Sequence, residues 1–295
     1  MMGAVSDGAP AIEVAGLRKA YGEREAVRGV DFTVAAGEVF GLLGPNGAGK
    51  TTTVEVLEGY RARDAGDVRV LGMDPGRRPR ALLARIGIVP QSGGAYPYLS
   101  ARETLAHWAT LYPAPRPVDE VLALAGLDDA AERRVRTLSG GQRRRLDFAL
   151  ALVGDPELIF LDEPTTGFDP AARRAAWDVV RALRDLGKTV LLTTHYLDEA
   201  QALSDRVAIL KDGRILAVGP PAGLGGAARA RVSYRGPDGA LVERMTDDPT
   251  TLLHELTAAA LARGERLEEL TVTRPSLEEV YLELTAAARE AAVAA

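Results

Sequence analysis

A glycine-rich segment near residue 45 carries the residue types that bind phosphate groups. The stretch 44–51 matches the pattern G-x-x-x-x-G-K-[ST], between an apolar run and a segment with helical spacing. Composition predicts roughly 0.004 chance matches to this pattern in the chain. Glycines let consecutive backbone N–H groups converge on phosphate oxygens, so the segment predicts binding of ATP or GTP. The residues expected at the nucleotide are Gly44, Pro45, Asn46, Gly47, Ala48, Gly49, Lys50, Thr51 and Thr52.

Two side chains of this segment have specific expected roles. Lys50 would reach the β- and γ-phosphates, and the Thr51 hydroxyl would ligate Mg²⁺. Of the 36 basic residues, 32 are arginine, and Lys50 is the only lysine between Lys19 and Lys188. A compact ammonium group therefore stands where phosphate binding requires one.

An apolar run over 158–161 ends in two carboxylates, Asp162 and Glu163. An apolar strand followed by two acids is, by itself, more often a strand that enters solvent. Downstream of a phosphate-binding loop the expectation changes. Asp162 is then placed to hold the Mg²⁺ shell, and Glu163 to polarise an attacking water.

The segment 138–142, Leu-Ser-Gly-Gly-Gln, resembles the signature motif of ATP-binding-cassette (ABC) ATPases. Alone it would indicate only a loop with an N-cap serine. Its glycines before a helix make a second phosphate-facing N-terminus. The resemblance implies that the motif closes over the γ-phosphate bound by the other subunit of a dimer. The residues concerned are Ser139, Gly140, Gly141 and Gln142.

Four more residues occur along the chain in the same order as the corresponding residues of the family. Tyr21 resembles the aromatic residue that stacks on adenine, and Gln91 the glutamine that touches Mg²⁺ and senses the transport partner. Asp169 resembles the aspartate at the subunit interface, and His195 the switch histidine that contacts γ-phosphate and water. Phe168 stands where the family usually has leucine. The implied catalytic residues are Lys50, Gln91, Glu163 and His195, and the implied metal ligands are Thr51, Gln91 and Asp162.

Strand and helix patterns alternate over 12–218, which predicts an α/β domain with a mostly parallel sheet. The resemblance implies a P-loop NTPase core with an N-terminal antiparallel β-subdomain and a helical insertion at about 95–155. Linker composition at Gly219-Pro220-Pro221 divides a nucleotide-binding domain, 1–220, from a small α+β domain, 221–295.

The segment 221–295 predicts a hairpin, 231–234 and 240–244, turned at 237–239. A helix near 250–262, a strand at 270–273 and a last helix with a capping box at 276–279 follow. The sequence supports two interpretations of this segment equally. The segment is either a small unit packed on its own core, or an accessory domain for homodimer contact or regulation.

Composition excludes several classes of protein. The chain has no cysteine, which excludes disulfide scaffolds, thiolate zinc sites and iron–sulfur clusters. Its net charge of −5 argues against a general nucleic-acid binder, and the arginines near 133–145 are expected to be a solvated face. Neither an export signal nor an apolar run of bilayer length is expected. Any link to a membrane would then require a partner.

Two function classes remain. One is an ATP-hydrolysing homodimer that powers a membrane transporter with separately encoded transmembrane subunits. The other is a soluble ABC ATPase acting in translation or on DNA. A single cassette without a coiled-coil insertion favours the first class.

The stretches 138–170 and 275–285 resemble daunorubicin/doxorubicin-resistance-type (ABC-2 type) exporters. That resemblance implies ATP and Mg²⁺ as ligands, and a drug, natural product or lipid-like cargo. It also implies a polytopic permease partner at the cytoplasmic face of the membrane, with the isolated chain soluble.

Overall fold

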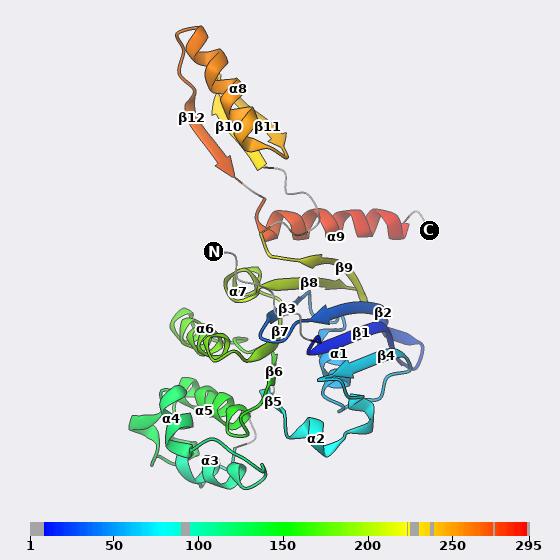
Figure 1. Cartoon of the computed structure of the whole chain (residues 1–295), viewed down its shortest axis with the longest axis vertical. Coiled ribbons are helices and arrows are strands. Elements are labelled where there is room, and N and C mark those ends of the chain that lie inside the picture. The colour runs from blue at the N-terminus through cyan, green and yellow to red at the C-terminus, as the bar shows by residue number, and fades with distance from the viewer. Residues whose placement is uncertain are drawn as a thin grey trace. The chain divides into compact units, whose positions relative to one another are not determined.

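The computed structural model describes residues 9–89, 95–222, 224, 230–236, 239–273 and 275–293 of the 295-residue chain (Figure 1). The chain divides into two compact units, Met1–Ile215 and Leu216–Ala295. No helix in the described residues is both long and apolar enough to span a bilayer.

A six-stranded sheet contains the parallel strands of the first unit, and residues 216–219 of its last strand belong to the second unit. Its strands are β3 (Val39–Leu43), β5 (Ile86–Val89), β6 (Leu158–Asp162), β7 (Thr189–Thr194), β8 (Arg206–Lys211) and β9 (Arg214–Gly219). Their order is β5-β6-β7-β3-β8-β9, and the neighbours from β5 to β8 pair in parallel. Every residue of β3 and β7 is buried, as in strands covered on both faces. The predicted parallel α/β core is confirmed.

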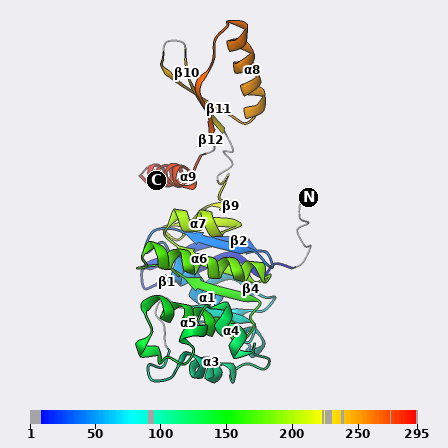
Figure 2. The same ribbon diagram turned by 90° about the vertical axis from the view of Figure 1, so that its left-hand side faces the viewer.

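Alternate residues of the central strands enter two different hydrophobic cores. Val39 and Leu161 belong to a core shared with α5 and α6, whereas Phe40 and Phe160 belong to a core shared with α1 and the antiparallel strands. Figures 1 and 2 show the sheet between these two layers. The helices are α1 (Lys50–Leu57), α2 (Arg80–Leu83), α3 (Ala101–Ala109), α4 (Val118–Leu124), α5 (Gly140–Leu152), α6 (Pro170–Asp185) and α7 (Leu197–Leu203).

The predicted antiparallel β-subdomain is also present. It consists of β1 (Ile12–Tyr21), β2 (Arg24–Val34) and β4 (Ala65–Val70), in the order β2-β1-β4. Strand β1 is ten residues long and irregular. Its register shifts between Val14 and Leu17, and Gly16 there has a φ of +60°. Such irregularities break the two-residue alternation from which strands are predicted.

Helices α3, α4 and α5 form the helical part between β5 and β6. The proline-rich residues 113–117 precede α4, and Gly126 follows it. Helix α3 begins with a capping box in which Ser100 Oγ accepts from the Glu103 N–H at 3.0 Å. Leu146 and Phe148 of α5 are buried in the same hydrophobic core as residues of β5, β6 and β7.

Strand β9 was not predicted, because it lies directly before the linker composition at 219–221. The turn before it is Asp212-Gly213, with φ values of +50° and +76°. Positive φ at both central residues defines a type I′ hairpin turn, and Asp-Gly is its preferred sequence. The signal was therefore present in the sequence.

The second unit contains a three-stranded antiparallel sheet in the order β11-β10-β12. Its elements are β10 (Ala230–Arg235), β11 (Leu241–Thr246), α8 (Pro249–Ala262), β12 (Glu268–Thr273) and α9 (Leu277–Val293). Ser276 and Glu279 form the predicted capping box, and Leu277 and Val280 are buried. Of the predicted turn at 237–239, residues 237 and 238 lie outside the described residues.

Candidate functional site

The loop between β3 and α1 requires glycine at two positions. A Cβ added to Gly44 would lie 2.2 Å from the Leu210 carbonyl oxygen. Gly49 has a φ of +106°, and a Cβ there would lie 2.4 Å from the Ala26 carbonyl oxygen. Only glycine allows this close backbone approach. The two glycines thereby bring the N-terminus of α1 to the carboxyl edge of the sheet, where ligands bind in open α/β folds.

Lys50 lies across this loop and is only 4% exposed. Its Nζ donates to the carbonyl oxygens of Gly44 at 2.8 Å and Pro45 at 3.2 Å. It also lies 3.2 Å from Glu163 Oε1. The loop therefore holds a buried cation beside a carboxylate, and a phosphate group would compete for that cation.

Glu163 follows β6 with a backbone φ of +46°, a conformation that costs energy in a non-glycine residue. Its Oε2 accepts from Thr166 Oγ1 at 3.1 Å, and its Oε1 lies 3.5 Å from His195 Nδ1. Burial by itself raises the pKa of this carboxyl, but Lys50, Thr166 and His195 together hold the pKa below its ordinary value. A carboxylate that is ionised at neutral pH thus faces the loop.

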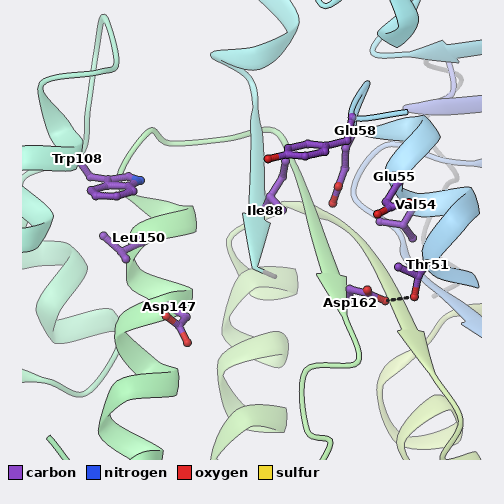
Figure 3. Close-up of a pocket in the computed structure, with 10 residues that line it drawn as sticks. Thr51, Val54, Glu55, Glu58, Ile88, Trp108, Asp147, Leu150 and Asp162 are labelled. Atoms are coloured by element: carbon purple, nitrogen blue, oxygen red, sulfur yellow. Dashed lines mark hydrogen bonds between the residues drawn. The ribbon is translucent and has the colours of Figure 1, made fainter. Parts of the chain in front are cut away.

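Asp162 is fixed by a residue that the sequence analysis did not identify. Thr193 of β7 stands opposite Asp162 in the parallel register. Its Oγ1 donates to Asp162 Oδ1 at 2.6 Å and accepts from the Glu163 N–H at 3.0 Å. Thr51 Oγ1 lies 3.5 Å from the same Asp162 oxygen (Figure 3). Only knowledge of which strands are neighbours would have revealed Thr193.

The Thr51 hydroxyl and the Asp162 carboxylate are hard oxygen donors of the kind that Mg²⁺ prefers. In the described residues, no group of three or more His, Cys, Asp or Glu side chains could hold a metal ion. Mg²⁺ usually keeps several waters and uses one or two protein ligands together with substrate phosphates. The two donors therefore fit an ion held jointly with a nucleotide.

Replacing Thr193 by valine is expected to lower the free energy of unfolding by about 1–3 kcal/mol, because it leaves buried polar groups without partners. It should also lower kcat for ATP hydrolysis, since Asp162 and Glu163 lose a shared anchor. Urea unfolding and steady-state ATPase assays measure the two effects. Thr189→Val is the control: this buried threonine of the same strand accepts from the Gly37 N–H at 2.9 Å, away from both acids. Equal kcat in the two variants would contradict the assigned role of Thr193.

A cavity of about 510 Å³ opens over the loop of residues 44–51. Tyr21 lines it and is 42% exposed, with the Arg61 guanidinium 5.1 Å from its ring centre. Arg24 also lines the cavity. It was not predicted as a site residue, although its position three residues after Tyr21 could have indicated a basic group near the aromatic ring. The cavity offers an aromatic face and basic groups above the loop. Other lining residues are Asn46, Gly47, Gly49, Lys50, Thr51, Thr52 and Glu163.

The segment 139–142 does not line this cavity in the described part of the chain. It forms the first turn of α5, where Ser139 Oγ accepts from the Gln142 N–H at 3.2 Å and Gln142 Oε1 accepts from the Ser139 N–H at 3.0 Å. A Cβ added to Gly140 would meet nothing within 4 Å. Within one chain the segment is therefore a capped, open helix end.

The predicted residue Asp169 has other partners in the structure. Asp169 caps α6 by accepting from the N–H groups of Ala171 and Ala172 at 2.9 and 2.8 Å. Gln91 lies outside the described residues. The structure brings together the other predicted groups, namely Lys50, Thr51, Asp162, Glu163 and His195.

A second cavity, of about 580 Å³, adjoins Thr51 and Asp162 on the side of the helical insertion. In Figure 3, Trp108 of α3 and Leu150 of α5 lie on one side and Val54 of α1 on the other. These walls are mainly apolar.

Glu58 is one of four acidic residues that line this cavity, together with Glu55, Asp147 and Asp162 (Figure 3). It is 9% exposed, and among the described residues its carboxyl has no hydrogen-bond or ion-pair partner. Burial, with the nearby charges of Asp162 and Glu55, raises its pKa to about 8. The cavity therefore presents a neutral carboxylic acid at pH 7.

Comparison with known sequences identifies close relatives. Residues 27–166 match the family model described as ABC transporter. The Nod factor export ATP-binding protein I of Rhizobium sp. (strain N33) is 41% identical, over 93% of this chain and 97% of the relative. The daunorubicin resistance ATP-binding protein DrrA3 of Streptomyces coeruleorubidus is 40% identical, over 93% of this chain and 96% of the relative.

Solved structures of ATP-binding cassettes also align with this chain. A structure titled as the ATP-binding subunit of an ABC transporter aligns with a TM-score of 0.68 and 25% identity, over 93% of this chain and 99% of that one. A dimeric ATP-binding cassette in a post-hydrolysis state, bound to ADP and Pi, aligns with a TM-score of 0.63 and 26% identity, over 71% of this chain and 98% of that one.

Proposed function

The chain belongs to the ATP-binding-cassette family of ATPases, and we propose that it is the subunit that hydrolyses ATP to drive a membrane exporter. One observation carries the catalytic part of this proposal. The side chains of Lys50, Glu163 and His195 meet at the mouth of a phosphate-binding loop, with distances of 3.2 and 3.5 Å from Glu163 to the other two.

Hydrolysis transfers the γ-phosphoryl group of ATP to water. The Gly44–Thr51 loop and Lys50 would bind the β- and γ-phosphates, which frees Glu163 from its ion pair with Lys50. Glu163 would then orient the attacking water and accept its proton, as the bond between the γ-phosphorus and the bridging oxygen breaks to leave ADP and phosphate. His195 would hold the γ-phosphate and water in line. Mg²⁺, held by Thr51, Asp162 and Gln91, would neutralise charge on the phosphate oxygens.

The active form in this proposal is a homodimer with ATP at the interface. In one chain, residues 139–142 form an exposed helix N-terminus that lines no part of that chain's own loop cavity. Such an end suits an anion presented by a second copy. Asp169 would lie at the same interface, and Tyr21 would stack on the adenine ring.

The exporter part of the proposal is supported by sequence similarity to relatives with known names. Two of them are named for Nod factor export and daunorubicin resistance, at 41% and 40% identity over most of the chain. We infer a hydrophobic drug, natural product or lipid-like cargo, and a polytopic permease that brings the chain to the cytoplasmic face of the membrane.

The cavity of Trp108 and Glu58 offers a place for that permease to dock. Apolar walls of Trp108, Leu150 and Ile88 suit apolar side chains, while Glu58 suits a basic one, because a cation favours the ionised form of the acid. We therefore propose that a cytoplasmic segment of the permease with apolar and basic side chains occupies this cavity.

Affinity purification of the tagged chain from detergent-solubilised membranes tests the partner. It should capture a polytopic membrane protein, and Trp108→Ala should reduce the captured amount at least about tenfold, because buried aromatic residues dominate interfaces. Leu111→Ala is the matched control, since Leu111 is 67% exposed in the same helical part and does not line the cavity. Capture of ribosomes or DNA instead would support the soluble class of ABC ATPase and contradict the exporter.

We also propose that residues 1–220, with a helical part at 95–155, are the nucleotide-binding domain, and that 221–295 are an accessory domain. The linker composition at 219–221 supports this division.

A further inference from the structure

Glu199 of α7 is a fully buried carboxyl group outside the groups assigned to ATP and Mg²⁺. It has 0% exposed surface. Its Oε1 accepts from Thr165 Oγ1 at 2.8 Å and from Trp177 Nε1 at 3.2 Å. Its Oε2 is buried and has no hydrogen-bond partner among the described residues. Such a group is costly to bury, so a specific role for it is worth testing.

The environment of Glu199 favours the neutral acid. Burial is the largest influence and raises its pKa, and the charge of Asp198 raises it further, whereas the nearby polar groups of Thr194, Thr165 and Trp177 oppose the rise. The Arg173 guanidinium donates to the neighbouring carboxylate, Asp198, at 3.0 Å. Among the described residues, Glu199 therefore acts as a hydrogen-bond acceptor and forms no ion pair.

The two donors lie on segments that carry other parts of the site. Thr165 is two residues after Glu163, and its carbonyl oxygen accepts from the Phe168 N–H at 3.1 Å. Trp177 lies on α6, the helix that Asp169 caps. Glu199 itself is four residues after His195, in the helix that follows that histidine. One carboxyl group thus joins the segments of Glu163, Asp169 and His195.

We propose that Glu199 is a positioning residue for ATP hydrolysis, which ties the loop of Glu163 and the helix of Asp169 to the segment of His195. This inference rests on the catalytic roles proposed for Glu163 and His195. The conformation of Glu163, with its positive φ, needs support from its surroundings to persist. The Thr165–Glu199 hydrogen bond supplies such support two residues away.

Replacing Glu199 by leucine fills a similar volume but removes both acceptor contacts. We expect kcat for ATP hydrolysis to fall about 10- to 100-fold, because small displacements of reacting groups have effects of this size. KM for ATP should change less than about threefold, since the phosphate-binding loop is a separate segment. Glu199→Gln keeps an acceptor oxygen in a neutral group and should restore kcat to within about threefold of the unmodified chain.

Amide hydrogen exchange provides a readout independent of ATP hydrolysis. In Glu199→Leu, exchange should accelerate over 164–169 and 195–198 together, and Glu199→Gln should show the unmodified pattern. All assays are run well below the lowest unfolding temperature of the variants, so that a loss of stability does not appear as a loss of kcat.

Three results would overturn the inference. They are unchanged exchange in Glu199→Leu, unchanged kcat in Glu199→Leu, and a loss in Glu199→Gln equal to that in Glu199→Leu. If the unmodified chain hydrolysed no ATP, the proposed function would fail, while the exchange data would still decide whether Glu199 joins the three segments.

Discussion

Glu163→Gln is expected to lower kcat for ATP hydrolysis by at least about 10²-fold while ATP stays bound, because glutamine keeps the size of the side chain but cannot accept a proton. In the structure, Glu163 is held as a carboxylate by Lys50, Thr166 and His195. Removing the charge leaves Lys50 free to bind phosphate. The variant should therefore accumulate as an ATP-bound dimer, which light scattering coupled to gel filtration at saturating Mg·ATP would detect.

The control for this variant is Glu13→Gln, which removes a charge from an exposed position of β1. It should leave both kcat and the oligomeric state unchanged. A Glu163→Gln chain that hydrolyses ATP within about threefold of the control rate would refute Glu163 as the group that activates water. A Glu163→Gln chain that remains monomeric with saturating Mg·ATP would count against the interfacial site.

Local patterns allowed the strand, loop and helix around residues 44–51 to be predicted, and phosphate binding by this loop stays a prediction. Residues 44–51 are consecutive, and their role depends on the strand before them and the helix after them, both of which have clear periodicity. The buried runs of β3 and β6 similarly predicted a parallel sheet, which the structure confirms. Sequence sufficed where a feature depends on neighbours along the chain.

Features that depend on neighbours in space were not predictable in the same way. Thr193 contacts Asp162 only because β6 and β7 are adjacent and in a particular register. Thr165, Trp177 and Glu199 meet although up to 34 positions separate them. Strand β9 is different, since the Asp212-Gly213 pair before it is a local hairpin signal in the sequence.

The role of residues 139–142 depends on a second copy of the chain, so single-chain geometry leaves it as a proposal. Two defects placed in different chains isolate it. Lys50→Ala removes the phosphate-binding cation. Gly140→Asp places a negative charge where γ-phosphate is expected, and it fits the isolated chain because a Cβ at Gly140 meets nothing within 4 Å. An acid in the first turn of a helix is, moreover, stabilising.

Each variant alone should hydrolyse ATP at least about 10²-fold more slowly than the unmodified chain, because every site in its homodimer carries one defect. In a mixed dimer, one site carries both defects and the other carries none, provided that residues 139–142 act on the partner's nucleotide.

The most direct test of the account is therefore ATPase activity in an equimolar mixture of Lys50→Ala and Gly140→Asp chains, with each variant alone as the baseline. Random pairing makes half of the dimers mixed, each with one intact site, so about a quarter of the unmodified rate should return if the sites act independently. A mixture as inactive as its components, although cross-linking shows that mixed dimers form, would mean that each chain completes its own site and would contradict the account.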